Sequence, residues 1–336
     1  MDYFFSFIIP VYNRPREVQE LFESLQAMEG DTPFEVVLVE DGSTEDASAV
    51  VAAFRNSLPI SYLVKENTGP GPSRNYGMQR ARGNYFIILD SDIILPPEYL
   101  RRVVDSLNER YVDCFGGPDK AHPSFTPVQK SIDYVMTSFL TTGGIRGGKA
   151  ASKRFEPRSF NMGLSARAFH DSGGFGNIHP GEDPDLSIRL KKMGYSLALF
   201  PTAFVYHKRR ISFKAFFRQV RKFGKVRPIL NRWHPGTSRL TYWFPTLFVL
   251  GLLLAVLLLF VLPAPLRFVL PALYAGYLTT LLANAFFKTG SPKVALLAVA
   301  ATILQFSAYG LGFLESTILV TFSKRKPEEI FPELFF

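Results

Sequence analysis

The fold of this chain is decided by the stretch Tyr85-Phe86-Ile87-Ile88-Leu89-Asp90-Ser91-Asp92. Its unbroken apolar run predicts a short strand that is buried on both faces, as in a parallel sheet covered by helices. Two carboxylates follow directly, where the strand ends. Ligands of such sheets bind beyond the carboxyl ends of the strands, so we expect Asp90 and Asp92 at a ligand-binding edge.

Strand and helix patterns alternate on both sides of this stretch. We predict strands at residues 4–11, 34–39, 60–64, 85–89, 112–115, 159–165 and 196–206. We predict helices after Pro15 and at residues 45–55, 69–82, 166–172 and 181–193. This alternation predicts an α/β fold with a doubly wound, mostly parallel sheet, in a domain over residues 1–207. Residues 116–158 are rich in Gly, Pro, Ser and Lys and predict a long loop.

The chain after residue 240 is strongly apolar, although hydrophobic residues make up 47% of the whole sequence. A helix over residues 240–262 would be about 34 Å long, enough to cross a hydrocarbon core of about 30 Å. We predict two further membrane spans at residues 266–287 and 294–320, and a tail at 323–336. The third segment leaves alternatives open. A single crossing would put residues 324–326 outside, against the positive-inside tendency, so this segment could instead re-enter, or break near Tyr309-Gly310-Leu311-Gly312 into a span and an interfacial piece.

The net charge of +9 comes from one segment. Residues 208–232 hold ten Lys or Arg and no Asp or Glu, which leaves the rest of the chain near −1. Apolar residues recur at helical spacing between the basic ones from Phe213 to Phe223. This pattern over residues 208–235 indicates a helix lying on anionic membrane lipid, and we expect no nucleic acid partner. The alternative is a helix whose apolar stripe packs on the soluble domain.

Cysteine content and the N-terminal residues bear on location. The single cysteine, Cys114, excludes an internal disulfide and fits a reducing compartment. Residues 1–5 lack the basic region and the long apolar core of a signal peptide. We therefore expect a cytoplasmic catalytic domain on a multi-pass anchor.

The carboxylates of Asp90 and Asp92 have the chemistry of a metal site. Hard divalent cations such as Mg²⁺ take oxygen ligands and share them with substrate phosphates. By itself the triplet is weak, because Asp and Ser are also common after strands as turn residues.

Four segments at predicted strand ends occur in a defined order. They are Ile9-Pro10-Val11-Tyr12-Asn13, Val39-Glu40-Asp41-Gly42-Ser43, Gly69-Pro70-Gly71-Pro72-Ser73-Arg74-Asn75-Tyr76-Gly77 and Leu89-Asp90-Ser91-Asp92. Together they resemble the family 2 glycosyltransferases, inverting enzymes with the GT-A fold, over about residues 4–225. The resemblance implies a nucleoside-diphosphate sugar as donor and Mg²⁺ or Mn²⁺ as cofactor. It also implies a bacterial inner membrane, with surface polysaccharide assembly as the setting.

The resemblance assigns the donor pocket to several of these residues. It implies that Asp41 holds the nucleotide base or ribose, with Pro10 and Tyr12 lining the same pocket. It places Arg74, near a predicted helix start, beside the diphosphate. A further segment, Phe160-Asn161-Met162-Gly163, also resembles the family, and there Asn161 would touch the donor sugar.

The metal is assigned in the same way. By resemblance, Asp90 and Asp92 serve ribose and metal. His207 follows the last predicted strand and could complete the metal or phosphate site; a solvated histidine at the end of the domain is the alternative. The basic run Lys208-Arg209-Arg210 could close over the diphosphate or contact lipid.

Glu182 and Asp183 look like the Glu-Asp motif of the family. Inverting transfer needs one base that takes the proton from the acceptor hydroxyl as it attacks the anomeric carbon. The resemblance assigns this base to Asp183 and puts Glu182 on the acceptor or diphosphate side. An Asp before Pro184 is also a good helix N-cap, and both roles are compatible, since a helix N-terminus favours a carboxylate.

Processive members of the family carry Gln-x-x-Arg-Trp where this chain has Gln219-Val220-Arg221-Lys222-Phe223. Gln219 and Lys222 are expected on the acceptor or diphosphate side. Because Lys and Phe replace Arg and Trp, the bidentate donor and the stacking platform are weaker, which does not favour processive synthesis.

The sequence therefore predicts an inverting, metal-dependent hexosyltransferase that acts on a lipid-linked, glycan or membrane-proximal acceptor and contacts membrane lipid. A polyprenyl-phosphate sugar synthase, whose acceptor is the lipid phosphate itself, is the closest alternative. A membrane protein that senses nucleotides without catalysis is a second alternative.

Overall fold

The computed structural model describes residues 2–120, 125–143, 155–207 and 212–336. The chain divides into two compact units. Unit 1 comprises Met1–His122, Lys149–Lys208 and Phe335–Phe336, and unit 2 comprises Pro123–Gly148 and Arg209–Leu334. Each unit is described by itself.

Unit 1 is built on a seven-stranded sheet with the strand order β3-β2-β1-β4-β8-β6-β9. All neighbouring strands are parallel except β8, which is antiparallel to β4 and β6. The strands are β1 Phe5–Val11, β2 Phe34–Asp41, β3 Ile60–Lys65, β4 Tyr85–Leu89, β6 Cys114–Gly116, β8 Asn161–Ser165 and β9 Leu197–Leu199. The doubly wound, mostly parallel sheet expected from the sequence is therefore present.

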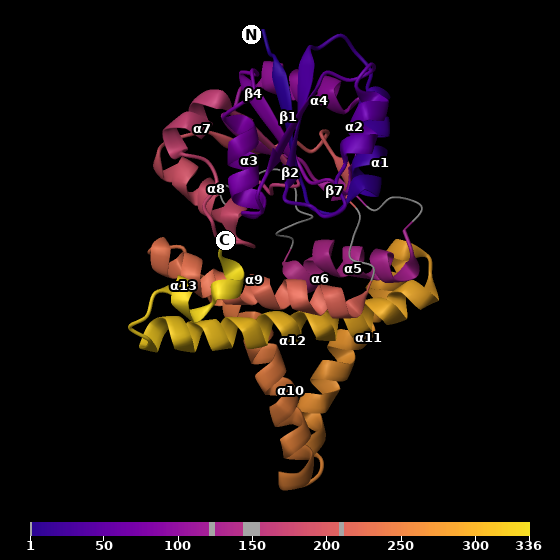
Figure 1. Cartoon of the computed structure of the whole chain (residues 1–336). Coiled ribbons are helices and arrows are strands. Elements are labelled where there is room, and N and C mark those ends of the chain that lie inside the picture. Colours follow the sequence, from indigo (N-terminus) through magenta and orange to yellow (C-terminus); the bar gives the residue numbers. More distant parts are fainter. Residues whose placement is uncertain (1, 121–124, 144–154, 208–211) are drawn as a thin grey trace. The chain divides into compact units, whose positions relative to one another are not determined.

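Helices cover both faces of this sheet (Figure 1). They are α1 Pro15–Gln26, α2 Ser48–Phe54, α3 Pro70–Met78, α4 Tyr99–Glu109, α7 Ala166–Ser172 and α8 Glu182–Lys192. Successive side chains of a strand point to opposite faces, so β1 sends Phe7 and Ile9 into a core with α1, α2 and α4. Ile8 points into a second core with α3, α7 and α8. Unit 1 thus has three layers, helices, sheet and helices. Because β1, β2, β3 and β4 are parallel, their carboxyl ends lie along one edge of the sheet.

A second, three-stranded sheet joins β5 Ile93–Ile94, β7 Asp119–Lys120 and β10 Val205–His207. The single strand predicted over residues 196–206 is two short strands, β9 and β10, in different sheets. Because His207 pairs with Ile93 across the β5–β10 ladder, this sheet brings His207 beside the residues that follow β4.

Unit 2 is helical. Its elements are α5 Pro127–Thr137, α6 Phe139–Thr142, α9 Phe213–Trp233, η1 Leu240–Trp243, α10 Phe244–Val261, η2 Leu266–Phe268, α11 Val269–Thr289, α12 Pro292–Phe322, α13 Pro327–Ile330 and η3 Pro332–Leu334. By length and composition, three segments could cross a membrane: Leu240–Val261, Leu266–Thr289 and Pro292–Phe322.

The helices α5 and α6 lie where the sequence was expected to form a loop. Thr126 and Gln129 form a capping box with Pro127 at the first turn, so the chain carries a clear helix start there. Ile132 and Val135 then bury their side chains in a cluster with α9, α11 and α12. Residues 123–148 therefore belong to unit 2 and interrupt the domain predicted over residues 1–207.

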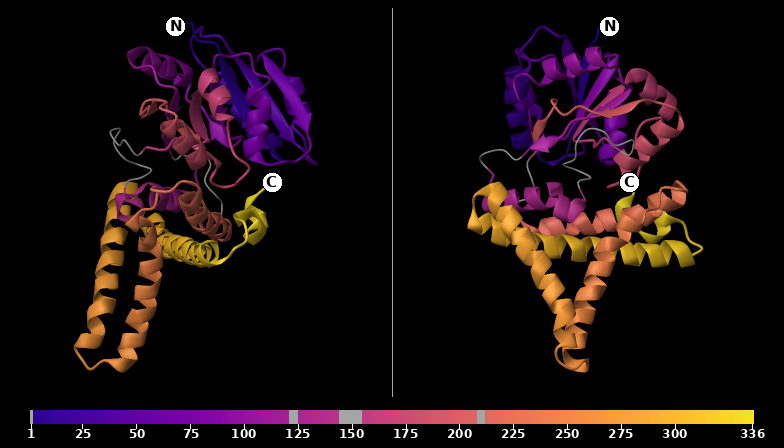
Figure 2. Two further views of the ribbon diagram at one scale, coloured as in Figure 1. Left: turned by 90° about the vertical axis from the view of Figure 1, so that its left-hand side faces the viewer. Right: turned by 180° about the vertical axis from the view of Figure 1, so that it is seen from behind.

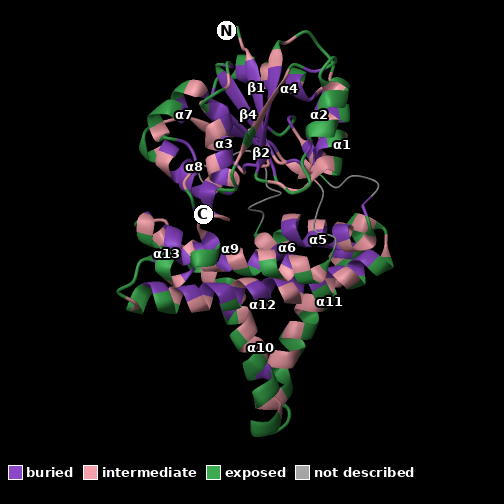
Figure 3. Cartoon of the chain, in the orientation of Figure 1, coloured by how far each residue is buried: buried purple, intermediate pink, exposed green. Residues whose placement is uncertain are grey.

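Within unit 2, α9 and α12 run side by side, and α10 and α11 form a hairpin that projects away from them (Figures 1 and 2). Burial follows this arrangement (Figure 3). Half of the apolar window of α12 is buried inside protein, against 17% in α10 and 6% in α11. The α10–α11 hairpin therefore exposes the largest share of its apolar residues, as expected of helices surrounded by lipid.

Candidate functional site: a metal and nucleotide-diphosphate centre

Three neighbouring parallel strands end at one edge of the large sheet of unit 1. Strand β1 lies between β2 and β4, so Tyr12, Asp41 and Asp90 stand at or directly after adjacent strand ends. Adjacent strands are about 5 Å apart, which brings these polar groups to one region. This edge is where parallel sheets bind ligands.

Asp90, Asp92 and His207 form the one group of potential metal ligands found among the described residues. One ligand atom from each lies within 4.8 Å of the others. The side chains of Asp92 and His207 are 14% and 18% exposed, so the group is partly buried but still reached by solvent. Two carboxylates and an imidazole are donors that Mn²⁺ and Mg²⁺ accept, and the residues present fit such an ion.

Two further residues hold this group, and sequence reasoning missed both. Asp92 Oδ2 accepts a hydrogen bond from Arg14 Nη1 at 3.2 Å. Asp119 Oδ2 lies 3.7 Å from His207 Nδ1, while His207 Nε2 faces Asp92 Oδ1 at 3.3 Å. The ring of Phe160 packs on the imidazole, with 4.8 Å between ring centroids. A carboxylate behind a metal-binding histidine fixes the ring orientation, which is the geometry found here for Asp119.

Arg74 is the central cation of the site, and it is buried. Its side chain is 3% exposed, and its guanidinium donates to Asp90 Oδ1 at 2.7 Å and to Glu182 Oε1 at 2.9 Å. The ring of Phe175 lies 5.3 Å from the guanidinium. Burial disfavours the charged form, but the two carboxylates outweigh it and raise the pKa of Arg74 above its usual value. Arg74 thus joins the end of β4 to the start of α8.

Helix α8 begins with Glu182 and Asp183, side by side but in different surroundings. Burial would raise the pKa of Glu182, but the charge and hydrogen bond of His179 and the charge of Arg74 lower it to about 2. The side chain of Asp183 is 15% exposed and lies 3.7 Å from Arg158 Nη1. The N-cap is Gly181, so Asp183 lies in the first helical turn and not at the cap position that its place before Pro184 suggested.

Asp41 lies at the end of β2 and organises the loop before α3. Its Oδ1 accepts from the backbone N–H of Thr68 at 3.0 Å and also from Lys65 Nζ, and its Oδ2 accepts from the N–H of Gly69 at 2.9 Å. Gly69 has a φ of +86°, a conformation that side chains with a Cβ rarely adopt. Lys65 Nζ also donates to Ser73 Oγ at 3.2 Å, next to Arg74 in the chain. These contacts connect Asp41 to the Arg74 network.

The remaining predicted donor residues divide into exposed and buried ones. Pro10 is partly buried at the end of β1, and the ring of Tyr12 is 50% exposed beside it. Asn161, expected to touch the donor sugar, is one of the buried residues. Its side chain is fully buried, and its amide donates to the Ala203 carbonyl and accepts from the Tyr99 hydroxyl. Asn161 is paired with Leu89 in the sheet, so the sequence placed it at the correct edge but not facing outward.

Gln219 and Lys222, expected on the acceptor or diphosphate side, belong to α9 in unit 2. Lys222 Nζ donates to the Glu333 carbonyl at 3.4 Å within that unit. Lys208, Arg209 and Arg210 lie outside the described residues.

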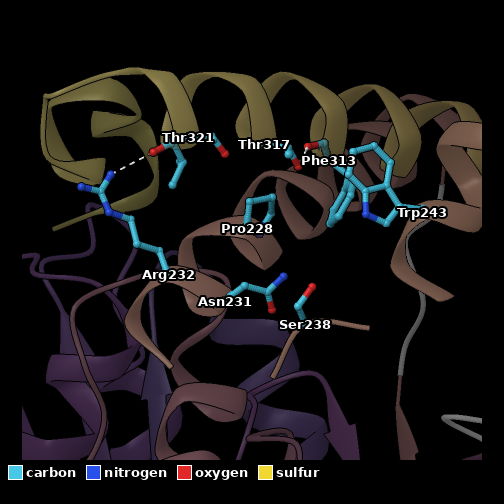
Figure 4. A pocket seen from close by; sticks show the side chains of 9 residues that line it. Pro228, Asn231, Arg232, Ser238, Trp243, Phe313, Thr317 and Thr321 are labelled. Carbon is cyan, nitrogen blue, oxygen red and sulfur yellow. Dashed lines mark hydrogen bonds between the residues drawn. The ribbon is translucent and has the colours of Figure 1, made fainter. Parts of the chain in front are cut away.

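A cavity of about 330 Å³ lies in unit 2 (Figure 4). Its lining combines aromatic, hydroxyl and amide side chains with one cation: Pro228, Asn231, Arg232, Ser238, Trp243, Phe313, Thr317, Val320 and Thr321. It holds no carboxylate, so it cannot serve as the metal centre. The candidate metal ligands Asp90, Asp92 and His207 all belong to unit 1.

Unit 1 is an α/β domain whose candidate metal ligands lie at the carboxyl ends of its strands. Residues 6–169 match the model of glycosyl transferase family 2. The stretch that this model matches belongs to glycosyl transferase family 2, and unit 1 has the GT-A fold. The fold is shared with the mannosyltransferase PcManGT from Pyrobaculum calidifontis, solved in complex with GDP-Man and Mn²⁺. That likeness has a TM-score of 0.59 at 15% identity and covers 97% of this chain and 89% of the other.

Curated relatives match over shorter stretches. The poly(ribitol-phosphate) beta-N-acetylglucosaminyltransferase TarS of Staphylococcus aureus is 35% identical over 112 residues, 32% of this chain and 20% of that protein. The succinoglycan biosynthesis protein ExoO of Rhizobium meliloti is 37% identical over 100 residues, 30% and 28% of the two chains. An undecaprenyl-phosphate 4-deoxy-4-formamido-L-arabinose transferase of Pseudomonas savastanoi pv. phaseolicola is 34% identical over 118 residues, 34% and 35%. The chain thus matches between a fifth and about a third of the length of these relatives.

Proposed function

We propose that the chain transfers a sugar, with inversion, from a nucleoside-diphosphate sugar to a lipid-linked or membrane-proximal acceptor. One observation carries the proposal: a single buried cation joins the metal-ligand group to the first turn of α8, which carries the expected base Asp183. Asp90 belongs to the metal group and pairs with Arg74, and Arg74 pairs with Glu182, the neighbour of Asp183 in that turn. Arg74 therefore ties the end of β4, where the diphosphate would bind, to the helix that carries the expected base.

The metal would be held by Asp90, Asp92 and His207. When bound, a divalent cation neutralises the charge that develops on the departing diphosphate. The relative of known structure in complex with GDP-Man and Mn²⁺ supports this assignment. Arg14 and Asp119 would act through the ligands that they contact, Asp92 and His207, by holding the carboxylate and the imidazole in place.

The nucleotide would lie along the ends of β1 and β2. The exposed ring of Tyr12 offers a face for a base to stack on, and Pro10 lies beside it. Asp41 already accepts two backbone N–H groups and the Lys65 ammonium. Four acceptor positions are available on a carboxylate, so one position of Asp41 remains for a ribose hydroxyl or a base N–H.

Asp183 would take the proton of the acceptor hydroxyl. Its carboxylate lies in the first turn of α8, where the helix macrodipole favours negative charge. Arg158 at 3.7 Å adds a nearby positive charge. Glu182 is held by Arg74 and His179, so it is the less available of the two carboxylates. Asp183 is therefore the better candidate for the base, and Glu182 for positioning.

The acceptor would be presented at a membrane, because unit 2 carries helices that are long and apolar enough to cross one. Relatives named for poly(ribitol-phosphate), succinoglycan and undecaprenyl-phosphate chemistry support a polymer or lipid-linked acceptor in surface polysaccharide assembly. The inner membrane, with unit 1 in the cytoplasm, is the proposed location.

The test is a panel of nucleotide sugars incubated with the purified chain, Mn²⁺ and a membrane lipid extract, with the wild type and Asp183→Asn compared. We expect one donor to give a glycosylated lipid-extract product that requires Mn²⁺ and the intact Asp183. Donor hydrolysis without product would argue for a different acceptor. If no nucleotide sugar is turned over at all, the nucleotide-sensing alternative replaces the enzyme.

A polyprenyl-phosphate sugar synthase is the second candidate, favoured by the relative that acts on undecaprenyl phosphate. A phosphate acceptor is already ionised at neutral pH and needs little deprotonation. Under this reading Asp183→Asn keeps most of its activity with polyprenyl phosphate as acceptor. Loss of activity by several hundredfold with the same acceptor would exclude it.

A further inference from the structure

We propose that α12, although apolar enough to span, lies at the membrane surface beside α9, so that the α10–α11 hairpin alone enters the hydrocarbon core. The surface that meets the lipid is one face of α12. Its exposed apolar residues are Leu296, Ala300, Leu311, Ile318, Leu319 and Phe322, and Ile303 and Leu314 are half-buried between them. A helix with one apolar face turned outward and protein on the other side fits the interface between headgroups and acyl chains.

The first argument is that both halves of α12 contact the same end of the α10–α11 hairpin. Near its start, Ala295 lies in one cluster with Leu281 and Ala285, close to the end of α11. Further along, Phe313 packs on Trp243, with 5.0 Å between ring centroids, at the start of α10. The start of α10 and the end of α11 form the open end of the hairpin and lie on the same side of the membrane.

Two neighbouring contacts repeat this pattern. Thr246 donates to the Gly310 carbonyl at 3.0 Å, and the rings of Phe244 and Phe306 are 5.4 Å apart. Residues 295 and 313 are about 27 Å apart along an α-helix, nearly the whole thickness of the hydrocarbon core. If α12 spanned the membrane, Phe313 would lie near the far end of α10. Phe313 instead packs on Trp243, directly before the first turn of α10. Both ends of this stretch therefore lie at one membrane level.

The second argument is the charge carried by α9. This helix has seven Lys or Arg and no Asp or Glu between Phe213 and Trp233. It packs closely on α12 along its middle: an added Cβ on Gly224 would clash with the backbone of Tyr309, and one on Gly312 with that of Arg221. If α12 crossed the membrane, α9 would be drawn in with it, at about 2.5–3.5 kcal/mol for each basic residue at the centre.

Ion pairs and hydrogen bonds tie the same two helices together. Glu315 of α12 pairs with Arg221 at 2.9 Å and with Lys225 at 3.2 Å. Arg232 donates to the Val320 carbonyl at 3.0 Å. Arg232 also lines the cavity of Figure 4, together with Thr317 and Thr321 from the last turns of α12 and with Ser238. A charged, hydroxyl-lined cavity at this end of α12 suits the headgroup region and not hydrocarbon.

The third argument is the return of the chain to unit 1 after α12. Phe335 forms an antiparallel bridge with Ile178, and the ring of Phe336 lies 6.1 Å from that of His179. These two residues belong to unit 1. No candidate span separates unit 1 from the start of α10 in the described chain, so an odd number of crossings would leave residues 335–336 on the opposite side.

The experiment has two arms on the full chain in membranes. In the first, Lys288→Cys, in the last turn of α11, and Lys324→Cys, after α12, are labelled with a membrane-impermeant maleimide in vesicles of each orientation. The buried native Cys114 is the background control. We expect both positions to react from the same side. Reaction of the two positions from opposite sides would overturn the proposal.

The second arm measures depth with lipid-bound quenchers of a fluorophore attached at single cysteines. On α12, the variants Leu296→Cys, Leu311→Cys and Ile318→Cys should report the same shallow depth. The matched control is α10, where Leu247→Cys, Leu254→Cys and Phe260→Cys should report steadily increasing depth. A depth along α12 that changes by about 1.5 Å per residue would show that it spans and would contradict the proposal.

Discussion

Two arginine–glutamate pairs of the same length show how the two units use charge differently. Arg74 and Glu182 in unit 1 are 2.9 Å apart, and so are Arg221 and Glu315 in unit 2. The first pair is 3% and 4% exposed, and the second is 46% and 32% exposed. An exposed pair gains little from a short distance, whereas breaking a buried pair leaves a charge in a poor solvent. We therefore expect the buried Arg74–Glu182 pair to contribute more to the stability of unit 1 than the exposed Arg221–Glu315 pair contributes to that of unit 2.

The largest effect is expected beside the buried pair, at Asp183. Replacing Asp183 by Asn keeps the size of the side chain and removes the base, so kcat for a hydroxyl acceptor should fall by about 10²–10⁴-fold. Donor affinity, measured by calorimetry, should change less than threefold. A kcat close to that of the wild type would remove Asp183 from the mechanism.

The second effect compares the two pairs directly. Arg74→Ala should lower the free energy of unfolding of the protein by about 3–5 kcal/mol, because Glu182 and Asp90 lose their buried partner. The matched variant Arg221→Ala should cost less than about 1 kcal/mol. Chemical denaturation followed by fluorescence measures both. Equal losses would show that burial does not separate the two pairs.

The third effect concerns pH and Glu182. Its pKa is about 2 in the folded chain, below an ordinary value of 4.5. A lowered pKa contributes stability above pH 4.5 that is lost as the pH falls towards 2, by about 3 kcal/mol in total. Wild type should lose more stability than Glu182→Gln between pH 6 and pH 3. Parallel pH curves for the two proteins would be inconsistent with this assignment.

A smaller effect is expected at Asp119, which stands behind His207. Asp119→Asn leaves the ligand set intact but weakens the orientation of the imidazole, so Mn²⁺ affinity should fall by about 10–100-fold. His207→Ala, which removes a ligand, is the comparison and should lose more. An unchanged Mn²⁺ affinity in Asp119→Asn would show that the Asp119 carboxylate does not position His207 for the metal.

Much of unit 1 could be predicted from the sequence because its strands are short apolar runs that end in polar residues. The stretch from Tyr85 to Asp92 predicted both a buried strand and two candidate metal ligands, since strand ends share one edge of a parallel sheet. Asp119 could not be found in this way. It meets His207 only because β7 pairs with β10, and this long-range pairing leaves no local pattern.

Other differences have equally specific causes. Arg74, expected beside the diphosphate, pairs with Asp90 and Glu182, and no local sequence pattern indicates these two long-range contacts. The helix α5 did carry a local signal, the Thr126–Gln129 capping box, within a stretch whose Gly and Pro content favoured a loop. For α12, length and hydropathy predict a membrane span, whereas its packing against the basic helix α9 and the start of α10 is the basis for placing it at the membrane surface.

The central claim is that Asp90, Asp92 and His207 bind a divalent cation together with the nucleotide. Paramagnetic resonance of Mn²⁺, titrated into the purified chain with and without each common nucleoside diphosphate, tests it most directly. We expect one bound Mn²⁺ per chain, tightened by one of the nucleotides, in the wild type and its loss in Asp92→Ala. Equal Mn²⁺ uptake by the two proteins, or none by the wild type with any nucleotide, would contradict the account.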